Sequence, residues 1–261
     1  MLLLTGCNGY DNGGKVTIAG EKVPINATTL SLKRAELSDR DLENLASLKD
    51  LEELNLYKSN ISDLTPISGL KKLRTLDIGN TDVTDLTPLA DLSELEVLSL
   101  FGCDVKDISP LAKLPALANL DLGNTSIPDL SPLLAIKSLR SLSLAEAEVD
   151  YTNLAELTQL ESLNLMSLPI DDLTLLSELT NLKRLELTAE TATNITPLLT
   201  LKNLEYLTLW GDEENLGELA QLGNLKSLIL YTRGNVDYEM LDVLQKAIPG
   251  LHIELEGHKG V

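Results

Sequence analysis

Leucine recurs along the chain with a fixed period. The pattern Leu-x-x-Leu-x-Leu recurs in nine units at spacings of 21 or 22 residues, with Ile78 in the last place of one unit. Within one unit, Leu76-Asp77-Ile78 alternates apolar and polar residues, which predicts a short strand with one buried face. A regular period of this length is typical of a repeat architecture. The nine units begin at Leu51, Leu73, Leu95, Leu117, Leu139, Leu160, Leu182, Leu204 and Leu225.

A second segment with a Thr-Pro or Ser-Pro pair follows most of these strands. Thr87 is predicted to cap a helical turn that begins at Pro88, because threonine accepts a bond from an orphan amide and proline has no amide to leave unpaired. A strand with a short helical return cannot bury its apolar face alone, so neighbouring units must stack. The same pair recurs as Thr65-Pro66, Ser109-Pro110, Ser131-Pro132 and Thr196-Pro197.

The ends of the chain depart from the repeat. Leu37 to Leu48 has helical apolar spacing, with Ser38 or Asp39 as its cap, and Asp237 to Ile248, with Met240 and Ile248 on one apolar face, predicts a second helix. Residues 251–255 alternate like a last strand. We therefore divide the chain into a truncated signal peptide (1–7), a tether (8–24), an N-terminal cap with a degenerate repeat (25–50), leucine-rich repeats (51–236) and a C-terminal helix–strand cap (237–261).

The segment Asp85-Leu86-Thr87-Pro88-Leu89, in a 22-residue repeat, resembles the bacterial internalin group of leucine-rich repeat proteins. The resemblance covers roughly residues 27–236. It implies an α/β fold, a curved leucine-rich repeat solenoid with a parallel β-ladder on the concave face and short helical or irregular returns on the convex face. It also implies a protein ligand held by concave aromatic residues, although the identity of a ligand does not transfer with a fold.

The first residues resemble a bacterial lipobox. Leu4-Thr5-Gly6-Cys7 fits that motif, which implies lipidation of Cys7 and anchoring to a membrane at the bacterial cell surface or in the periplasm. The basic and fully apolar parts of a signal peptide are missing before Leu2, so we interpret the signal as truncated. The alternative is a disordered tail in which Cys7 has no role. No other segment has 18 consecutive apolar residues, as a spanning helix would need.

The charge balance excludes some classes of partner. With 21 Lys and Arg against 40 Asp and Glu, the net charge is −19, which repels nucleic acid and anionic lipid headgroups. We expect a monomer that binds no nucleic acid and needs no cofactor. The two cysteines are too few for a disulfide framework. Cys103 shares its place in the repeat with small residues, which favours a buried, unreactive thiol over a redox role.

Little in the sequence suggests catalysis or metal binding. The two histidines, His252 and His258, both lie at the carboxyl end, so a catalytic triad drawing on the repeats is hard to build and we predict no enzyme. One acidic column has two interpretations: a calcium ladder, or carboxylates that accept backbone amide bonds at a turn. We favour the second and predict no metal site. The column contains Asp63, Asp85, Asp107, Asp129 and Asp172, followed by Asn194.

Aromatic residues gather at the third, fifth and seventh positions of the units, which point away from the buried leucines. Five of the eight aromatic residues fall in these three columns, which hold 27 of the 261 positions. This enrichment favours a binding face, because aromatic residues are common interface anchors; the alternative is that they simply suit strands. Our candidate ligand-binding residues are Tyr57, Phe101, Met166, Arg184, Tyr206, Trp210, Ile229 and Tyr231.

These observations predict a non-enzymatic, surface-anchored module that binds a protein or peptide on its concave face. The alternative is a structural or adaptor component of a cell-envelope assembly that uses the convex face or the caps. A contiguous apolar patch on the convex side would favour the alternative.

Overall fold

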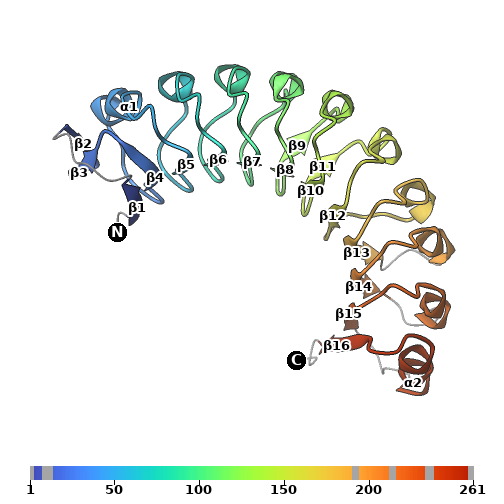
Figure 1. The fold of residues 1–261 in the computed structure, drawn as a ribbon. Helices are drawn as coiled ribbons and strands as arrows, with labels where there is room; N and C mark the ends of the chain where they lie inside the picture. The colour runs from blue at the N-terminus through green and yellow to red at the C-terminus, as the bar shows by residue number, and fades with distance from the viewer. Residues whose placement is uncertain (1–2, 8–13, 190–193, 212–215, 233–237, 258–261) are drawn as a thin grey trace. The chain divides into compact units, whose positions relative to one another are not determined.

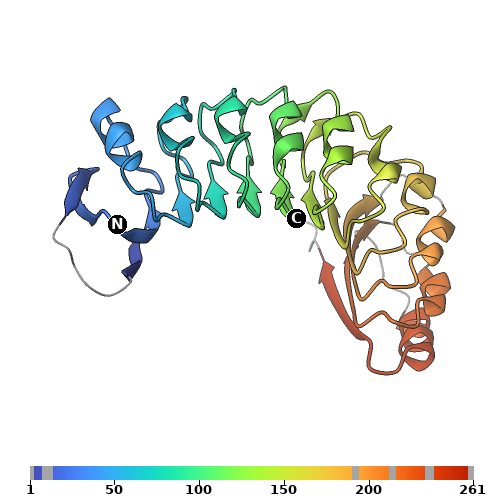
Figure 2. The same ribbon diagram turned by 45° about the horizontal axis from the view of Figure 1, so that its top comes forward.

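The computed structural model describes residues 3–7, 14–189, 194–211, 216–232 and 238–257. The chain forms two compact units, unit 1 with Met1–Leu139 and Glu148–Asp150, and unit 2 with Arg140–Ala147 and Tyr151–Val261. In each unit, short strands line one side and short helical segments line the other, as Figures 1 and 2 show. The predicted leucine-rich repeat solenoid with a parallel ladder is confirmed.

The strands of each unit follow the chain order in one sheet. In unit 1 the sheet order is β1-β4-β5-β6-β7-β8, and in unit 2 it is β10-β12-β13-β14-β15-β16. All pairs are parallel except β1 with β4. The strands that unit 1 contributes to this sheet are β1 (Leu3–Cys7), β4 (Ala27–Ser31), β5 (Glu53–Asn55), β6 (Thr75–Asp77), β7 (Val97–Ser99) and β8 (Asn119–Asp121). Those of unit 2 are β10 (Ser141–Ser143), β12 (Ser162–Leu165), β13 (Arg184–Ala189), β14 (Tyr206–Gly211), β15 (Ser227–Thr232) and β16 (His252–Gly257).

The opposite side of each unit, which we call the return side, consists of 3-10 helices. Of the eight 3-10 helices in the described residues, five have proline at their first or second position. A two-stranded parallel ladder of β9 (Ser126–Ile127) and β11 (Glu148–Val149) adds to the return side of unit 1. The 3-10 helices are η1 (Thr65–Ile67), η2 (Thr87–Leu89), η3 (Ser109–Lys113) and η4 (Ser131–Ala135) in unit 1, and η5 (Leu154–Glu156), η6 (Leu173–Leu176), η7 (Thr196–Thr200) and η8 (Leu216–Gln221) in unit 2.

The capping role that we predicted for threonine is wrong. Thr87 is the first residue of η2, and the residue before it makes no side-chain cap. The acceptor is instead Asp85, two residues before Thr87. Its Oδ1 atom accepts a hydrogen bond from the Thr87 amide at 2.8 Å. The same bond recurs at 2.7 to 2.9 Å throughout the acidic column, at Asp63, Asp107, Asp129, Asp172 and Asn194.

The acidic column is therefore a set of turn acceptors, as we favoured from the sequence. These hydrogen bonds favour the ionised carboxylate, and they lower the pKa of all five aspartates in the column. Among the described residues, no group of three or more His, Cys, Asp or Glu side chains is placed to hold a metal ion.

The core is aliphatic. The leucines that open and close each Leu-x-x-Leu-x-Leu pattern are buried between the strands and the return side, and Leu73, Leu76 and Ile78 have exposed fractions of 1% or less. Burying a side chain of this size stabilises the fold by about 1.5 to 3 kcal/mol. The regular stacking of these side chains is what sets the register of the strand face.

Cys103 belongs to this core. Its thiol is 2% exposed and donates to the Ile78 carbonyl at 3.2 Å. The equivalent Ser59 and Thr81 are also buried and donate their hydroxyls to carbonyls three residues earlier. The predicted burial of Cys103 is confirmed, and this burial raises the pKa of its thiol.

The amino-terminal segment contains more regular structure than we expected. β1 pairs with β4, and a hairpin of β2 (Lys15–Ile18) and β3 (Glu21–Pro24) occupies most of the range that we assigned to a tether. Helix α1 (Asp39–Leu45) begins at Ser38, whose hydroxyl accepts from the Asp41 amide in a capping box.

The carboxyl end of unit 2 contains α2 (Tyr238–Ala247), which packs against η8 with Leu241 and Leu244 buried. The last strand, β16, pairs in parallel with β15. Within the described residues, no helix combines the length and apolar character needed to cross a bilayer.

Candidate functional site

The outward side of the parallel sheet, which we call the strand face, contains the three columns that the sequence singled out. The register confirms that these columns stack. Arg184 pairs with Tyr206, and Thr188, Trp210 and Tyr231 form one row across β13, β14 and β15. Because side chains in register on neighbouring strands share a face, residues from separate repeats form one surface.

Trp210 and Tyr231 stack on each other at the end of this row. Their ring centroids are 5.5 Å apart and the planes are inclined by 25°. Both rings are half-buried, whereas Leu209 and Leu230 beside them are 2% exposed and fill the core. The stacked pair therefore lies outside the core and offers a rigid aromatic surface.

Arg184 and Tyr206 form a second contact on the same face. The central carbon of the guanidinium lies 4.4 Å from the centroid of the Tyr206 ring, which is a cation–π arrangement. Tyr206 is 37% exposed and is one of four large apolar or aromatic residues of the described chain that count as exposed. The strand face thus holds both an aromatic surface and a cation stacked upon one.

Two further candidates complete this surface. Ile229 is half-buried and pairs with Thr208 between the two aromatic contacts. The Thr188 hydroxyl lies 4.0 Å from the sulfur of Met166, which extends the Trp210 row by one repeat. The structure therefore brings together six of the eight predicted residues, all in unit 2, as the aromatic patch: Met166, Arg184, Tyr206, Trp210, Ile229 and Tyr231.

The two remaining candidates, Tyr57 and Phe101, lie in unit 1. The ammonium groups of Lys33 and Lys58 lie 4.8 and 5.4 Å from the centroid of the Tyr57 ring. Gly79 lies against that ring, and a Cβ atom there would be 3.1 Å from Tyr57 Cδ2, which is tighter than an ordinary van der Waals contact. Phe101 is half-buried. Unit 1 therefore presents isolated aromatic rings where unit 2 presents a cluster.

The fifth column has a structural role that sequence reasoning missed. Asn55, Asp77, Asp121 and Asn164 each accept the backbone amide of the residue two places later, at 2.9 to 3.0 Å. Asn55 also donates to Asp77 across the repeat at 3.0 Å, and burial raises the pKa of Asp77. The preference for Asn and Asp at this place was the available signal, because these residues commonly bond to nearby backbone amides.

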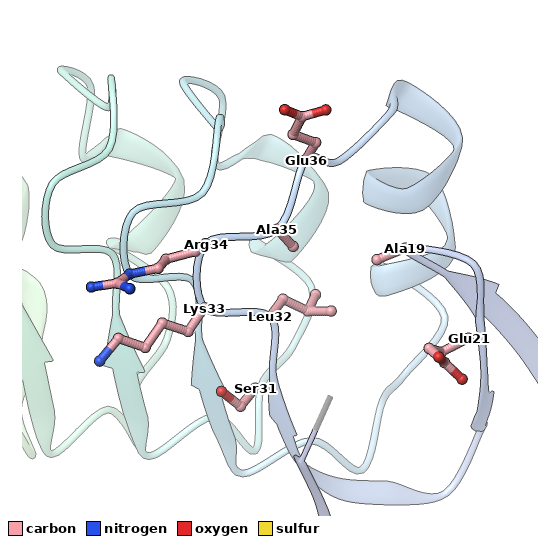
Figure 3. Close-up of a pocket in the computed structure, with 8 residues that line it drawn as sticks. All are labelled: Ala19, Glu21, Ser31, Leu32, Lys33, Arg34, Ala35 and Glu36. Atoms are coloured by element: carbon pink, nitrogen blue, oxygen red, sulfur yellow. The ribbon is translucent and has the colours of Figure 1, made fainter. Parts of the chain in front are cut away.

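A pocket of about 320 Å³ lies in unit 1, between the β2–β3 turn and the segment that follows β4. In Figure 3 the Lys33 and Arg34 side chains extend toward the following repeats, away from Ala19 and Glu21 on the other side. The lining of this pocket contains no histidine or cysteine. Its lining residues are Ala19, Glu21, Ser31, Leu32, Lys33, Arg34, Ala35 and Glu36.

Among the residues that we considered for lipidation and catalysis, His252 alone has a described side chain. The backbone of Cys7 ends β1, and its side chain lies outside the described part of the chain. His258 also lies outside the described residues, while His252 is exposed on β16 opposite Ser227.

Comparisons with known proteins agree with this geometry. The family described as leucine-rich repeats, in two copies, matches residues 49–91 and 93–135. The fold is similar to a crystal structure of an internalin (inlF) from Listeria monocytogenes, with 27% identity, a TM-score of 0.64 and coverage of 93% of this chain and 90% of that one. Internalin C2 of the same organism is 29% identical, with a TM-score of 0.61 and coverage of 73% of this chain and 85% of that one.

A third structure, the functional domain of InlJ from Listeria monocytogenes, shares the fold at 16% identity and a TM-score of 0.50, with coverage of 89% of this chain and 64% of that one. No curated protein sequence matches this chain. The chain thus has the leucine-rich repeat fold and resembles Listeria internalins.

Proposed function

We propose that this protein is a non-enzymatic binding module that holds a protein or peptide ligand on the strand face of unit 2. The observation that carries the proposal is the aromatic patch. The only tryptophan of the chain stacks on Tyr231 outside an aliphatic core, and Tyr206, four residues before Trp210 on β14, stacks on Arg184. Trp, Tyr and Arg are the residue types most often found as energetic anchors of interfaces.

The patch has no evident role in stability that would explain these residue types. Leucines supply the buried positions of β14 and β15, so aromatic side chains on the outward side are not needed for the core. Covering such a surface with a partner removes apolar area from water. Stacked rings also lose little side-chain entropy on binding, because they are already ordered.

Exposed side chains on the C-terminal cap favour the alternative of an adaptor role. The exposed large apolar or aromatic residues of the described chain are Ile25, Tyr206, Tyr238 and Val243. None of them lies on a 3-10 helix of the return side, but Tyr238 and Val243 lie on α2, where they are 70% and 54% exposed. A contact through the C-terminal cap is therefore the second candidate.

One experiment separates the two surfaces. Peptides selected from a random phage-displayed library against the whole protein can be titrated against the parent, Trp210→Ala and Tyr238→Ala. Trp210→Ala is expected to weaken binding by about 2 kcal/mol, or roughly thirtyfold, with Tyr238→Ala near the parent value. The reverse order would favour the cap. A large fall in melting temperature for Trp210→Ala would instead assign Trp210 to the core.

We further infer that the module is held at a bacterial membrane by a lipid on Cys7. The support is the motif Leu4-Thr5-Gly6-Cys7. Expressed behind an intact signal peptide, the parent protein is expected in the membrane fraction and Cys7→Ser in the soluble fraction. Equal membrane association of both forms would exclude the lipid anchor.

A further inference from the structure

We propose that the ligand segment covering the aromatic patch is basic, and that it places a lysine or arginine side chain on the Trp210–Tyr231 stack beside Glu256. This inference rests on the proposed function and adds the chemistry of the partner. It is carried by the carboxylates that border the patch and by the geometry of its rings.

Glutamate side chains on the neighbouring strands lie next to the aromatic patch. In the parallel register, Glu256 on β16 stands opposite Tyr231, and Glu254 stands opposite Ile229. On the other side, Glu186 on β13 stands opposite Thr208. Glu254 and Glu256 are exposed and Glu186 is half-buried. Residues in register share a face, so these carboxylates border the rings on the outward side of the sheet.

These carboxylates have no ion-pair partner among the described residues, in which no lysine or arginine nitrogen lies within 4.0 Å of them. Elsewhere in unit 2 the repeat pairs its charges across strands, as in Lys183 with Glu161 at 2.6 Å and Lys226 with Glu205 at 2.7 Å. The carboxylates beside the patch are thus available to an incoming cation. Glu161 and Glu205, which precede β12 and β14, are already paired with lysines.

The rings provide the second half of the recognition. Arg184 stacked on Tyr206 shows that a cation is accepted on an aromatic ring of this face. Trp210 and Tyr231 lie four residues further along the strands than Arg184 and its row, about 13 Å away at the rise of a β-strand. A ligand cation over this stack therefore avoids repulsion from Arg184 and approaches Glu256. Cation–π contact with Trp and Tyr is among the favourable forms of this interaction.

The charge of the whole chain acts in the same direction. A net charge of −19 attracts cationic segments and repels acidic ones before contact. Long-range attraction alone would not select the patch, so a test must separate the local carboxylates from the total charge. Two exposed glutamates on the return side of unit 2, Glu156 and Glu178, supply a matched control.

The test uses two fluorescein-labelled probes, hexaarginine and hexaglutamate, titrated by fluorescence anisotropy at 0.15 M NaCl, where exposed charges are screened beyond about 8 Å. Glu254→Gln/Glu256→Gln is expected to weaken hexaarginine binding about fivefold, and Trp210→Ala by at least as much. The control variant Glu156→Gln/Glu178→Gln changes the net charge by the same amount. It is expected to change the affinity for hexaarginine less than twofold. Hexaglutamate is expected not to bind. Circular dichroism melts confirm that each variant folds.

The outcomes separate this inference from the proposed function. Equal weakening by the two glutamine pairs, or preferential binding of hexaglutamate, would overturn the basic ligand. If Trp210→Ala weakens binding of the phage-selected peptides while Glu254→Gln/Glu256→Gln leaves hexaarginine binding unchanged, the binding face stands and the charge preference fails. If Trp210→Ala affects neither hexaarginine nor the selected peptides, both proposals fail together.

Discussion

Asp77 and Asp85 belong to one repeat, yet their pKa values shift in opposite directions. Asp85 is exposed on the return side, and hydrogen bonds from Thr87, first from its side chain and then from its amide, lower the pKa of its carboxyl. Asp77 is half-buried on the strand face, where burial raises the pKa. At the scale of the residue, the surroundings on each side of the sheet decide whether the ionised or the protonated form of an aspartate carboxyl is favoured.

The lowered pKa values predict a stability that depends on pH. A carboxyl whose pKa is lower in the folded chain than its ordinary value of 3.8 stabilises the fold above that pH, and the contribution is lost as the pH falls through the folded value. Asn194 makes the same turn bond at 2.9 Å, so asparagine keeps the acceptor without the titration. Compared with Asp63→Asn/Asp85→Asn/Asp107→Asn, the parent is expected to melt higher at pH 7.

That advantage is expected to shrink as the pH falls below 3.8 and the carboxylates take up protons, so it is smaller at pH 2.5 than at pH 7. Thermal unfolding followed by circular dichroism at both pH values measures the difference, and comparison with the triple variant cancels the opposite contribution of Asp77. A constant difference in melting temperature between pH 7 and pH 2.5 would contradict the prediction.

At the scale of the element, the turn that follows each strand repeats one backbone conformation. The second residue of this turn has a positive φ in seven repeats, but only one of the seven is glycine. A left-handed conformation costs an ordinary residue roughly 1 to 2 kcal/mol, so the repeat stores strain at this place. The residues are Arg34, Lys58, Asn80, Gly102, Asn124, Glu146 and Ser167.

Two substitutions at equivalent turns are expected to act in opposite directions. Gly102→Ala adds a Cβ at φ +68°, 3.0 Å from Asn80 Oδ1, and is expected to lower the free energy of unfolding by about 1 kcal/mol. Glu146→Gly, at φ +60°, is expected to raise it by about 0.5 kcal/mol, because relief of strain exceeds the added entropy of the unfolded chain. Urea unfolding of both variants tests the pair. A loss of stability for Glu146→Gly would show that this turn is not strained.

At the scale of the whole molecule, each repeat depends on a neighbour to cover its apolar side. In unit 2 the last repeat is covered by β16, which pairs along all of β15, and by α2, which packs against η8. Repeat proteins need such terminal caps for solubility, because an open strand edge and a bare apolar layer promote association.

Removal of this cap is expected to make the protein associate. A chain that ends at Thr232 exposes the edge of β15 and the buried Leu228 and Leu230, whereas a chain that ends at Gly257 keeps the cap. Size-exclusion chromatography with light scattering compares the two. A monomeric 232-residue chain that melts at the parent temperature would show that the cap is dispensable.

The sequence alone predicted the repeat, the buried leucines and the outward columns because a 22-residue period specifies which side chains face inward. Leu76 and Ile78 are buried and Tyr206 is exposed as that period requires. The position of Cys103 in the core followed from the same argument. A pattern that recurs in every unit reports the contacts that every unit makes with its neighbours.

Only the tertiary structure decided the contacts that occur once. These contacts are the Trp210–Tyr231 stack, the cation–π contact of Arg184 with Tyr206, and the carboxylates beside them. Each depends on which residues two neighbouring strands bring into register. The sequence favoured Asp85 as an acceptor of backbone amides, but coordinates were needed to show that it accepts the Thr87 amide and that Thr87 does not cap the turn. The sequence determined which face each residue occupies, since that depends on local period. The structure decided its partners, since those depend on side-chain geometry across repeats.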